Sequence, residues 1–281
     1  MVIVTVLLLT ELKHTFTEFA QRMKNDEMIT LAKFLAISGI ILPMLPHKNL
    51  IPDINLTPYS IWLATVVVSG ISYLSYLLKR YVFHESGVLV SGIIGGLYSS
   101  TATISVLARK SRKASEQEAN EYVAAMLLAV SMMFLRFMIL ILIFSREIFT
   151  SIYPYLLIMS VVAAVVAWFI HSRHRRSKDM ADESEDEDSS NPLEFKVALI
   201  FATLFVVFTV LTHYTLVYAG TGGLNLLSFV SGLSDITPFI LNLLQNTGSV
   251  AVLVVVACSM QAIISNILVN MFYALFFAGK G

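Results

Sequence analysis

Long apolar runs separated by short charged stretches are the feature that most constrains how this chain can fold. Of its 281 residues, 57% are hydrophobic and only 14% are charged, whereas soluble domains carry about 25% charged residues. A run of about 20 apolar residues is enough to cross the hydrocarbon core as a helix. The sequence therefore predicts an all-α polytopic membrane protein whose principal partner is the lipid bilayer.

Composition and motifs also exclude several classes of protein. The formal net charge is zero, which argues against nucleic acid as a partner. The sequence has no phosphate-binding glycine loop, no HExxH motif, no paired Cys/His spacing and no nucleophile elbow, so it does not predict an enzyme or an ATP-driven pump. The single cysteine, Cys258, is expected to pack in an apolar run. No cofactor is expected apart from a bound inorganic ion.

The apolar runs predict one transmembrane domain, residues 1–281, with an extra amino-terminal helix in residues 1–24 followed by eight segments, A to H. The amino terminus lacks the basic leader and cleavage site of a signal peptide. The segments are Met28 to about Leu45, Pro58 to Leu78, Gly87 to Ala108, about Tyr122 to Phe144, Ile152 to Ile170, Leu193 to Tyr218, Gly223 to Gln245 and Gly248 to Ala278. Residues 171–190, basic and then acidic, are expected to form a solvated cytoplasmic loop.

The lysines and arginines discriminate between two topologies. If all eight segments cross, Lys79 and Arg80 lie on the opposite side from the basic cluster at 109–113. If C and G instead enter the bilayer and return, all basic clusters share one side, and only Lys48 and Arg146 lie opposite. The positive-inside bias favours the second topology, with the basic loops cytoplasmic.

Segments C and G also resemble each other. Aligned without a gap, Gly87 matches Gly223, Gly96 matches Gly232 and Thr101 matches Thr237. Each segment is interrupted near its middle by small and hydroxyl residues, which weaken a helix, and lipid tolerates a broken backbone only where protein or water covers it.

These patterns predict an inverted-topology repeat, with residues 28–144 as the first copy and 152–278 as the second. Its two re-entrant or broken helices would meet near the midplane, as in many secondary transporters. We therefore expect residues 95–103 and 231–238 to be non-helical and close together. The alternative is that two Gly/Ser-rich helices simply pack closely.

A series of short motifs in residues 25–278 resembles the carboxy-terminal membrane domain of MgtC/SapB-family proteins, a domain without an assigned function. The matching residues are Glu27 with Lys33-Phe34; Ile41-Leu42-Pro43 with Pro46; Pro58-Tyr59 with Ile61-Trp62; Gly95-Gly96-Leu97-Tyr98-Ser99-Ser100-Thr101-Ala102-Thr103; Leu107-Ala108-Arg109; Met133 with Arg136; Asn191-Pro192-Leu193-Glu194; and Ser231-Gly232-Leu233 with Asp235.

The resemblance implies a multi-pass protein of a prokaryotic cell (inner or plasma) membrane. The chain departs from the family in two ways. It has no match to the amino-terminal MgtC-like domain, so the regulatory roles of that domain are not carried over. It also has Asn266 and Asn270 at the place where the family pattern is an Asn followed by a Lys. The family name suggests magnesium but is no argument for magnesium transport.

Two ionisable residues fall deep inside predicted segments, where a charge costs roughly 2.5 to 3.5 kcal/mol on insertion scales. Arg136 lies within segment D, and Asp235 lies at the interruption of segment G. In the functional interpretation, Asp235 coordinates or relays a cation, as the candidate metal ligand, while Arg136 sets the local charge. In the structural interpretation, the two form a buried ion pair that holds the halves together.

Further polar residues complete the predicted ion pathway. Ser99, Ser100, Thr101, Thr103 and Thr237 offer hydroxyls that could replace the hydration shell of an ion, and their alternative role is to bond neighbouring helices. Asn266 and Asn270 share one helix face, which is expected to face segment G or a cavity.

The sequence thus predicts a membrane transporter or channel for a small inorganic ion, and Asp235 favours a cation or protons. The alternative is a non-transporting membrane protein that regulates a partner complex. A membrane enzyme acting on lipid is a third hypothesis, but no nucleophile–base pair supports it. A homodimer is the default expectation for oligomeric state.

Overall fold

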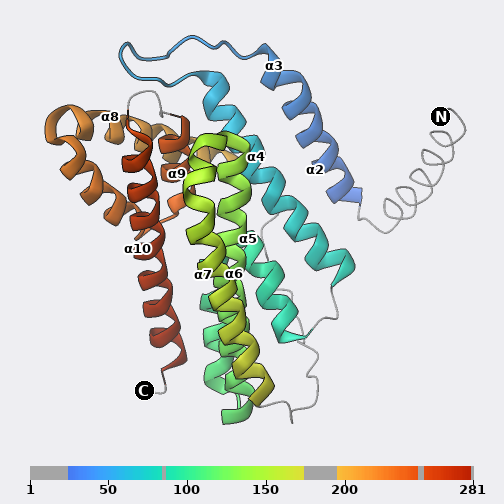
Figure 1. The fold of residues 1–281 in the computed structure, drawn as a ribbon. Coiled ribbons are helices and arrows are strands. Elements are labelled where there is room, and N and C mark those ends of the chain that lie inside the picture. Colours follow the sequence, from blue (N-terminus) through green and yellow to red (C-terminus); the bar gives the residue numbers. More distant parts are fainter. Residues whose placement is uncertain (1–24, 84–86, 174–194, 246–249, 280–281) are drawn as a thin grey trace, which may run out of the picture. The chain divides into compact units, whose positions relative to one another are not determined.

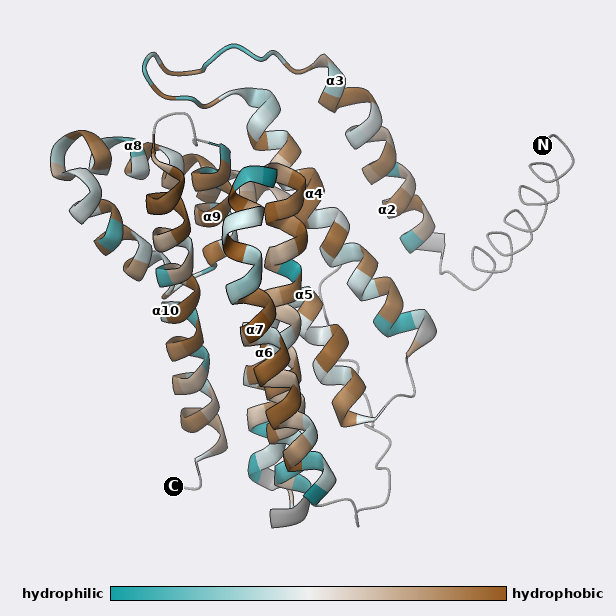
Figure 2. Cartoon of the chain, viewed as in Figure 1, coloured by the Kyte–Doolittle hydropathy of each residue, from teal (hydrophilic) through white to brown (hydrophobic). Residues whose placement is uncertain are grey.

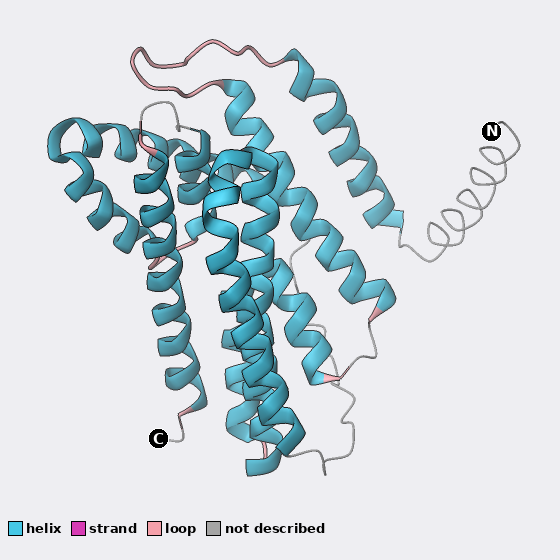
Figure 3. Cartoon of the chain, in the orientation of Figure 1, coloured by secondary structure: helices cyan, strands magenta, loops and turns pink. Residues whose placement is uncertain are grey.

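A computed structural model describes residues 25–83, 87–173, 195–245 and 250–279. Every element in these ranges is a helix, which confirms the predicted all-α class (Figure 3). The chain divides into two units, the first ending at Met44 and the second beginning at Leu45. The predicted amino-terminal helix, residues 1–24, lies outside the described residues, as does nearly all of the predicted loop 171–190.

The described part of the first unit is one apolar helical stretch. It consists of α2 (Asn25–Ala36), the π-helical turn η1 (Ile37–Ile41) and the short α3 (Leu42–Met44). Residues Glu27–Met44 are long and apolar enough to cross a membrane. Large side chains such as Leu35 and Met44 are exposed within the unit, as expected for a helix whose solvent is lipid.

The second unit contains the remaining helices. They are α4 (Pro58–Leu77), the π-helical turn η2 (Leu78–Val82), α5 (Val88–Lys113), α6 (Glu116–Phe144), α7 (Arg146–Arg173), α8 (Phe195–Ser231), α9 (Ile236–Gln245) and α10 (Val252–Ala278). Local sequence fixes several of their starts. Thr57 and Ser60 form a capping box in front of α4, with Pro58 as its first residue, and Ser115 and Glu118 form one in front of α6. Such caps satisfy the free amides at a helix start.

Helix α5 is a hairpin and not a straight span. Ser99 has φ −158° and ψ 105°, which breaks the helix. A Cβ placed on Gly95 would lie 3.2 Å from the Cβ of Thr103, whereas residues eight apart in a straight helix are about 12 Å apart. Val88 and Ala108, near the two ends of α5, belong to the same buried cluster. The chain therefore enters, reverses at Ser99 and returns to the same end.

The second half of the unit contains a matching reversal. Helix α8 is interrupted at Gly220, whose positive φ of 59° suits glycine. A Cβ on Gly223 would lie 2.8 Å from Cγ2 of Thr215, so residues 221–231 turn back beside the preceding helix. The chain then breaks again at residues 232–235 before α9 begins. We call residues 88–113 the first hairpin, with its tip at Ser99, and residues 221–245 the second hairpin, with its tip at 232–235.

The two hairpins start from opposite ends of the second unit (Figure 1). At one end, Arg109 of α5 stacks on Phe277 of α10, and His171 of α7 lies 4.0 Å from Glu121 of α6. At the other end, the carboxyl end of α9 meets the start of α4, where Gln245 Nε2 donates to the Ser60 carbonyl at 3.3 Å. This is the inverted arrangement that the sequence predicts for segments B to D and F to H.

The end that carries Arg109 also carries most of the charge. Figure 2 shows long hydrophobic helix bodies, with hydrophilic residues gathered where α6 begins and where α5 and α7 end. We call this the basic end; its described cations are Lys79, Arg80, Arg109, Lys110, Arg112 and Arg173. Away from the basic end, nine of the ten residues of α9, Ile236 to Leu244, are buried. Several of them form one core with buried side chains of α6, α7, α8 and α10.

The breaks are narrower than the sequence analysis predicted. Residues 95–103 were expected to be non-helical, but only Ser99 leaves helical geometry. Of residues 231–238, only 232–235 do so. The reason is local: the Ser99 hydroxyl and the Asp235 carboxylate each cap the half-helix that follows the break, so regular structure resumes within one residue. By length and hydropathy alone, α5 could cross a membrane, but its reversal at Ser99 shows that it does not.

The hairpin geometry of α5 predicts a specific cross-link. In a Cys258→Ala background, we expect Gly95→Cys with Thr103→Cys to form an intramolecular disulfide, because their Cβ atoms would lie 3.2 Å apart and need to separate by only a few tenths of an ångström to reach disulfide geometry. The readout is loss of maleimide-PEG labelling when the protein is denatured in SDS after mild oxidation, so that every free thiol can react. The matched control is Ile264→Cys with Phe272→Cys, which has the same spacing in α10. Equal labelling of the two pairs would show that α5 is straight.

Candidate functional site

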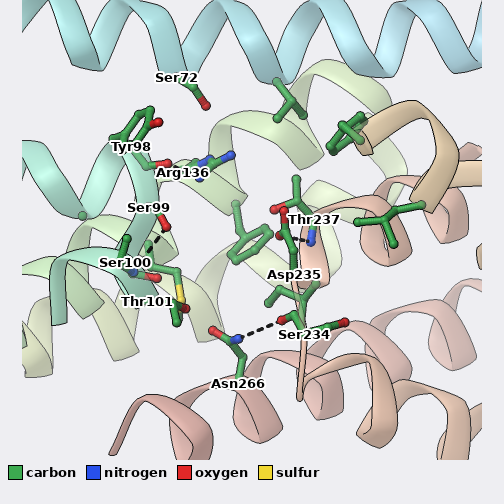
Figure 4. A pocket seen from close by; sticks show the side chains of 18 of the residues that line it. Ser72, Tyr98, Ser99, Ser100, Thr101, Arg136, Ser234, Asp235, Thr237 and Asn266 are labelled. Atoms are coloured by element: carbon green, nitrogen blue, oxygen red, sulfur yellow. Dashed lines mark hydrogen bonds between the residues drawn. The ribbon is translucent and has the colours of Figure 1, made fainter. Parts of the chain in front are cut away.

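The tips of the two hairpins line one cavity of about 480 Å³. Figure 4 shows the polar side chains around it. Six helices and the second tip contribute to its wall. The lining residues are Val68, Ser69 and Ser72 of α4; Gly96 and residues 98–102 of α5; Met133, Arg136 and Phe137 of α6; Val197, Ile200, Phe201 and Leu204 of α8; residues 233–237; and Asn266, Val269 and Tyr273 of α10.

At the first tip, both ends of the broken helix are capped. The Ser99 hydroxyl accepts a hydrogen bond from the Ala102 amide at 3.4 Å, at the start of the second half-helix. Arg136 Nη1 donates to the carbonyl of Tyr98 at 2.8 Å, at the end of the first half-helix. A partly buried arginine thus satisfies a carbonyl that the break leaves without a helical partner.

The second tip is capped in the same manner. Asp235 Oδ1 accepts from the Thr237 amide at 3.0 Å and caps α9. On the carbonyl side, Asn266 Nδ2 donates to the Gly232 carbonyl at 3.2 Å and to the Ser234 carbonyl at 3.4 Å. Ser265 Oγ donates to the Phe229 carbonyl at 2.7 Å. At both tips, the helix that follows the hairpin supplies the donors.

The same ungapped alignment that relates segments C and G relates these structural roles. It pairs Ser99 with Asp235, and each caps the half-helix that follows it. It pairs Gly96 with Gly232, and each packs against the next helix, Gly96 on Ala129 and Gly232 on Ser265. A Cβ on Gly96 would lie only 2.5 Å from Cα of Ala129, so the close approach requires glycine.

Several hydroxyls in the cavity wall have no hydrogen-bond partner in the part of the chain that the structure describes. Ser69, Ser72, Ser100 and Thr237 are 7%, 8%, 7% and 3% exposed. All four line the cavity, and no hydrogen bond of these hydroxyls joins them to another described residue. Hydroxyls are rarely left unbonded when buried, so the cavity is suited to water or a polar ligand.

Arg136 and Asp235 both line the cavity, but they do not form the buried ion pair of the structural interpretation. No salt bridge joins them within the described residues, although the two charges interact electrostatically. Figure 4 shows the guanidinium on one side of the pocket and Asp235 with Thr237 on the other. Arg136 Nε is buried and has no hydrogen-bond partner among the described residues, while Asp235 is exposed to the cavity.

Most of the predicted pathway residues meet at this cavity. Ser99, Ser100, Thr101, Arg136, Asp235, Thr237 and Asn266 all line it. Thr103 and Asn270 do not: Thr103 packs on Gly95 inside the first hairpin, and Asn270 donates to Asn266 Oδ1 at 3.2 Å. Asn270 therefore orients a residue of the wall instead of forming part of it.

The contribution of α4 to the cavity was not predicted from the sequence. Ser69 and Ser72 stand three apart in an otherwise apolar helix, a spacing that puts both hydroxyls on one face. That spacing could have indicated them. No group of three or more His, Cys, Asp or Glu residues that could hold a metal occurs among the described residues. A metal-binding role for Asp235 stays a prediction.

Comparisons with known proteins give a family but no activity. The family model described as "Domain of unknown function (DUF4010)" matches residues 66–278. A protein of Aquifex aeolicus (strain VF5) named "Uncharacterized protein" is 27% identical over 196 residues, which cover 69% of this chain and 83% of that protein. No solved structure matches. The matched family region contains both hairpins.

The caps at the second tip predict a loss of stability. We expect Asn266→Ala to lower the free energy of unfolding by about 1–3 kcal/mol, because two carbonyls lose their donor in a buried setting. Thermal unfolding in detergent measures the change. The matched control is Asn225→Ala, whose exposed side chain accepts only a weak 3.5 Å contact from Cys258 Sγ. Equal effects of the two substitutions would contradict the capping role.

Proposed function

Since this chain belongs to the DUF4010 family, which has no known activity, we propose from the cavity that it moves a small inorganic ion across the membrane as a transporter or channel. The observation that carries the proposal is the meeting of two capped helix breaks, from opposite ends of the unit, at one polar cavity. Inverted repeats with discontinuous helices commonly bind their substrate at such a point.

The unfavourable free energy of placing charged and polar side chains in the membrane interior supports an ionic ligand. A charge in the membrane interior is unfavourable by a few kcal/mol, and the wall contains both Arg136 and Asp235 without a salt bridge between them among the described residues. The hydroxyls on α4, α5 and α9 that have no partner among the described residues add to this unfavourable free energy. A ligand that uses these groups, or the water that accompanies it, would recover the lost interactions.

The alternative is a membrane protein that does not transport and instead regulates a partner complex. Such a protein needs an outer surface that matches its partner, and it gains nothing from unpaired polar groups in its interior. The polar residues point inward (Figure 4), which favours the transport proposal. The proposal assigns binding and passage of an ion, not catalysis, to this site.

Topology and location follow from the charges at the two ends. We infer that the basic end faces the cytoplasm of a prokaryotic cell, since the described cations other than Lys33, Lys48, Arg136 and Arg146 gather there. Two further proposals rest on the sequence. One is the resemblance to the carboxy-terminal domains of MgtC/SapB-family proteins, and the other is a homodimer.

Blocking the cavity is expected to stop ion movement. Ser72→Trp puts an indole into the wall, and we expect flux through reconstituted liposomes to fall at least tenfold, because an indole takes up much of the space and removes a hydroxyl. The control is Leu74→Trp, two residues along the same helix at an exposed position. It should transport like the original protein.

The flux measurement covers chloride, nitrate, sodium, potassium, magnesium and protons in separate experiments. Movement of one ion class that Ser72→Trp abolishes supports the proposal. If the folded, reconstituted protein moves none of these ions, the proposal is wrong.

Orientation is checked by labelling whole cells. In a Cys258→Ala background, Lys48→Cys should react with a membrane-impermeant maleimide added outside, since Lys48 is exposed and lies in the turn before α4. Arg112→Cys, exposed at the basic end, should react only after the cells are opened. The reverse pattern would invert the proposed topology.

A further inference from the structure

We infer that the ion bound between the two tips is a small monovalent inorganic anion. This inference rests on the proposed function and specifies its substrate. It departs from the preference for a cation or protons that the sequence alone favours. An anion is favoured over a cation because protein groups bond the carbonyl ends of the half-helices, whereas the amide ends face the cavity.

At both tips, protein donors bond carbonyls next to the break. A cation site at a broken helix needs free carbonyl oxygens, but here the Tyr98 carbonyl accepts from Arg136. At the second tip, the Gly232 and Ser234 carbonyls accept from Asn266. The partial negative charge at both carbonyl ends is therefore offset by donors, one of them a full positive charge.

The amide ends face the cavity. The second half of α5 begins at Ser100 and α9 begins at Ile236, and both starts line the cavity. The first amides of a helix have no partner within it, and each helix start carries about +0.5 charge. Among the described residues, one amide at each start is capped by a side chain: Ala102 by the Ser99 hydroxyl and Thr237 by the Asp235 carboxylate. Pro238 has no amide, so the start of α9 offers the amides of Ile236 and Phe239.

Side chains add donors that are independent of the helix ends. Ser72, Ser100 and Thr237 are each more than nine-tenths buried as residues, they line the cavity, and their hydroxyls have no hydrogen bond to another described residue. Arg136 Nε is buried without a partner as well. In Figure 4, these groups surround the same space from α4, α5, α6 and α9. Such a set of donors fits an acceptor-only ligand.

Asp235 has a different role from the one the sequence suggested. Its Oδ1 caps the amide of Thr237, a structural task that Asn performs equally well. Its charge balances that of Arg136 across the cavity, so the helix starts supply most of the remaining positive potential. One full negative charge in the wall disfavours multivalent anions and favours a monovalent one.

These roles predict opposite effects for the two charged residues. Arg136→Gln should lower chloride efflux from proteoliposomes at least tenfold, because the site loses its cation while an amide donor stays near the Tyr98 carbonyl. Asp235→Asn should keep the cap and raise efflux about tenfold at low chloride, because the anion loses a like-charged neighbour. If Asp235 instead ligates a cation, Asp235→Asn should abolish transport.

The experiment uses the full chain in vesicles loaded with potassium chloride, with valinomycin present and a chloride electrode as readout. Arg146→Gln is the matched control, since Arg146 is exposed at the far end of the unit; it should behave like the original protein. Arg136→Lys, which keeps the charge, should retain more flux than Arg136→Gln and guards against misfolding as the cause.

The possible outcomes distinguish failure of the anion inference from failure of the proposed function. Chloride or nitrate efflux with the predicted responses of Arg136 and Asp235 supports the anion inference. Flux of sodium, potassium or protons alone, lost in Asp235→Asn, overturns the anion inference but keeps the proposed function. An absence of flux for every ion, with the variants folded, overturns both.

Discussion

Inside a membrane, every backbone amide and carbonyl must find a partner in the protein or in a water-filled cavity, and this requirement governs how the second unit can contain two broken helices. The carbonyl at the first break is satisfied by Arg136, and those at the second by Asn266 and Ser265. The amide sides are capped by Ser99 and Asp235. The residues that look most functional therefore also make the breaks possible. Substituting them tests structure and transport together, which is why conservative variants matter.

Close packing of small residues brings the tips to the same depth. Gly92 and Gly96 pack directly on the backbone of α6 at Ala125 and Ala129, and Gly232 packs on α10 at Ser265. A larger side chain at these glycines would push each hairpin away from the helix that caps it. The cap and the close contact therefore depend on each other. Together they position one cavity between two hairpins that come from opposite ends.

Much of this could be predicted from the sequence because it depends on composition and periodicity. The helical class, the segment positions, the two opposed hairpins and seven of the cavity residues follow from apolar runs, basic clusters and the match of Gly96 with Gly232. The details at the tips could not. Whether Asp235 ligates an ion or caps α9, and whether Arg136 pairs with Asp235 or with the Tyr98 carbonyl, depends on side-chain geometry. For the same reason, Thr103 and Asn270 were assigned to the cavity although they pack beside it.

The central claim is that the two tips enclose a water-filled space within an apolar bundle. Single cysteines at Ser100 and Thr237, in a Cys258→Ala background, test it through their reaction rate with a charged, membrane-impermeant thiol reagent in open membranes. The account predicts that both react at least tenfold faster than a cysteine at Leu268 or Met271, which lie on the exposed face of α10 and are expected to face lipid, where thiols scarcely ionise. Equal, slow reaction at all four positions would show that the tips are dry and would contradict the account.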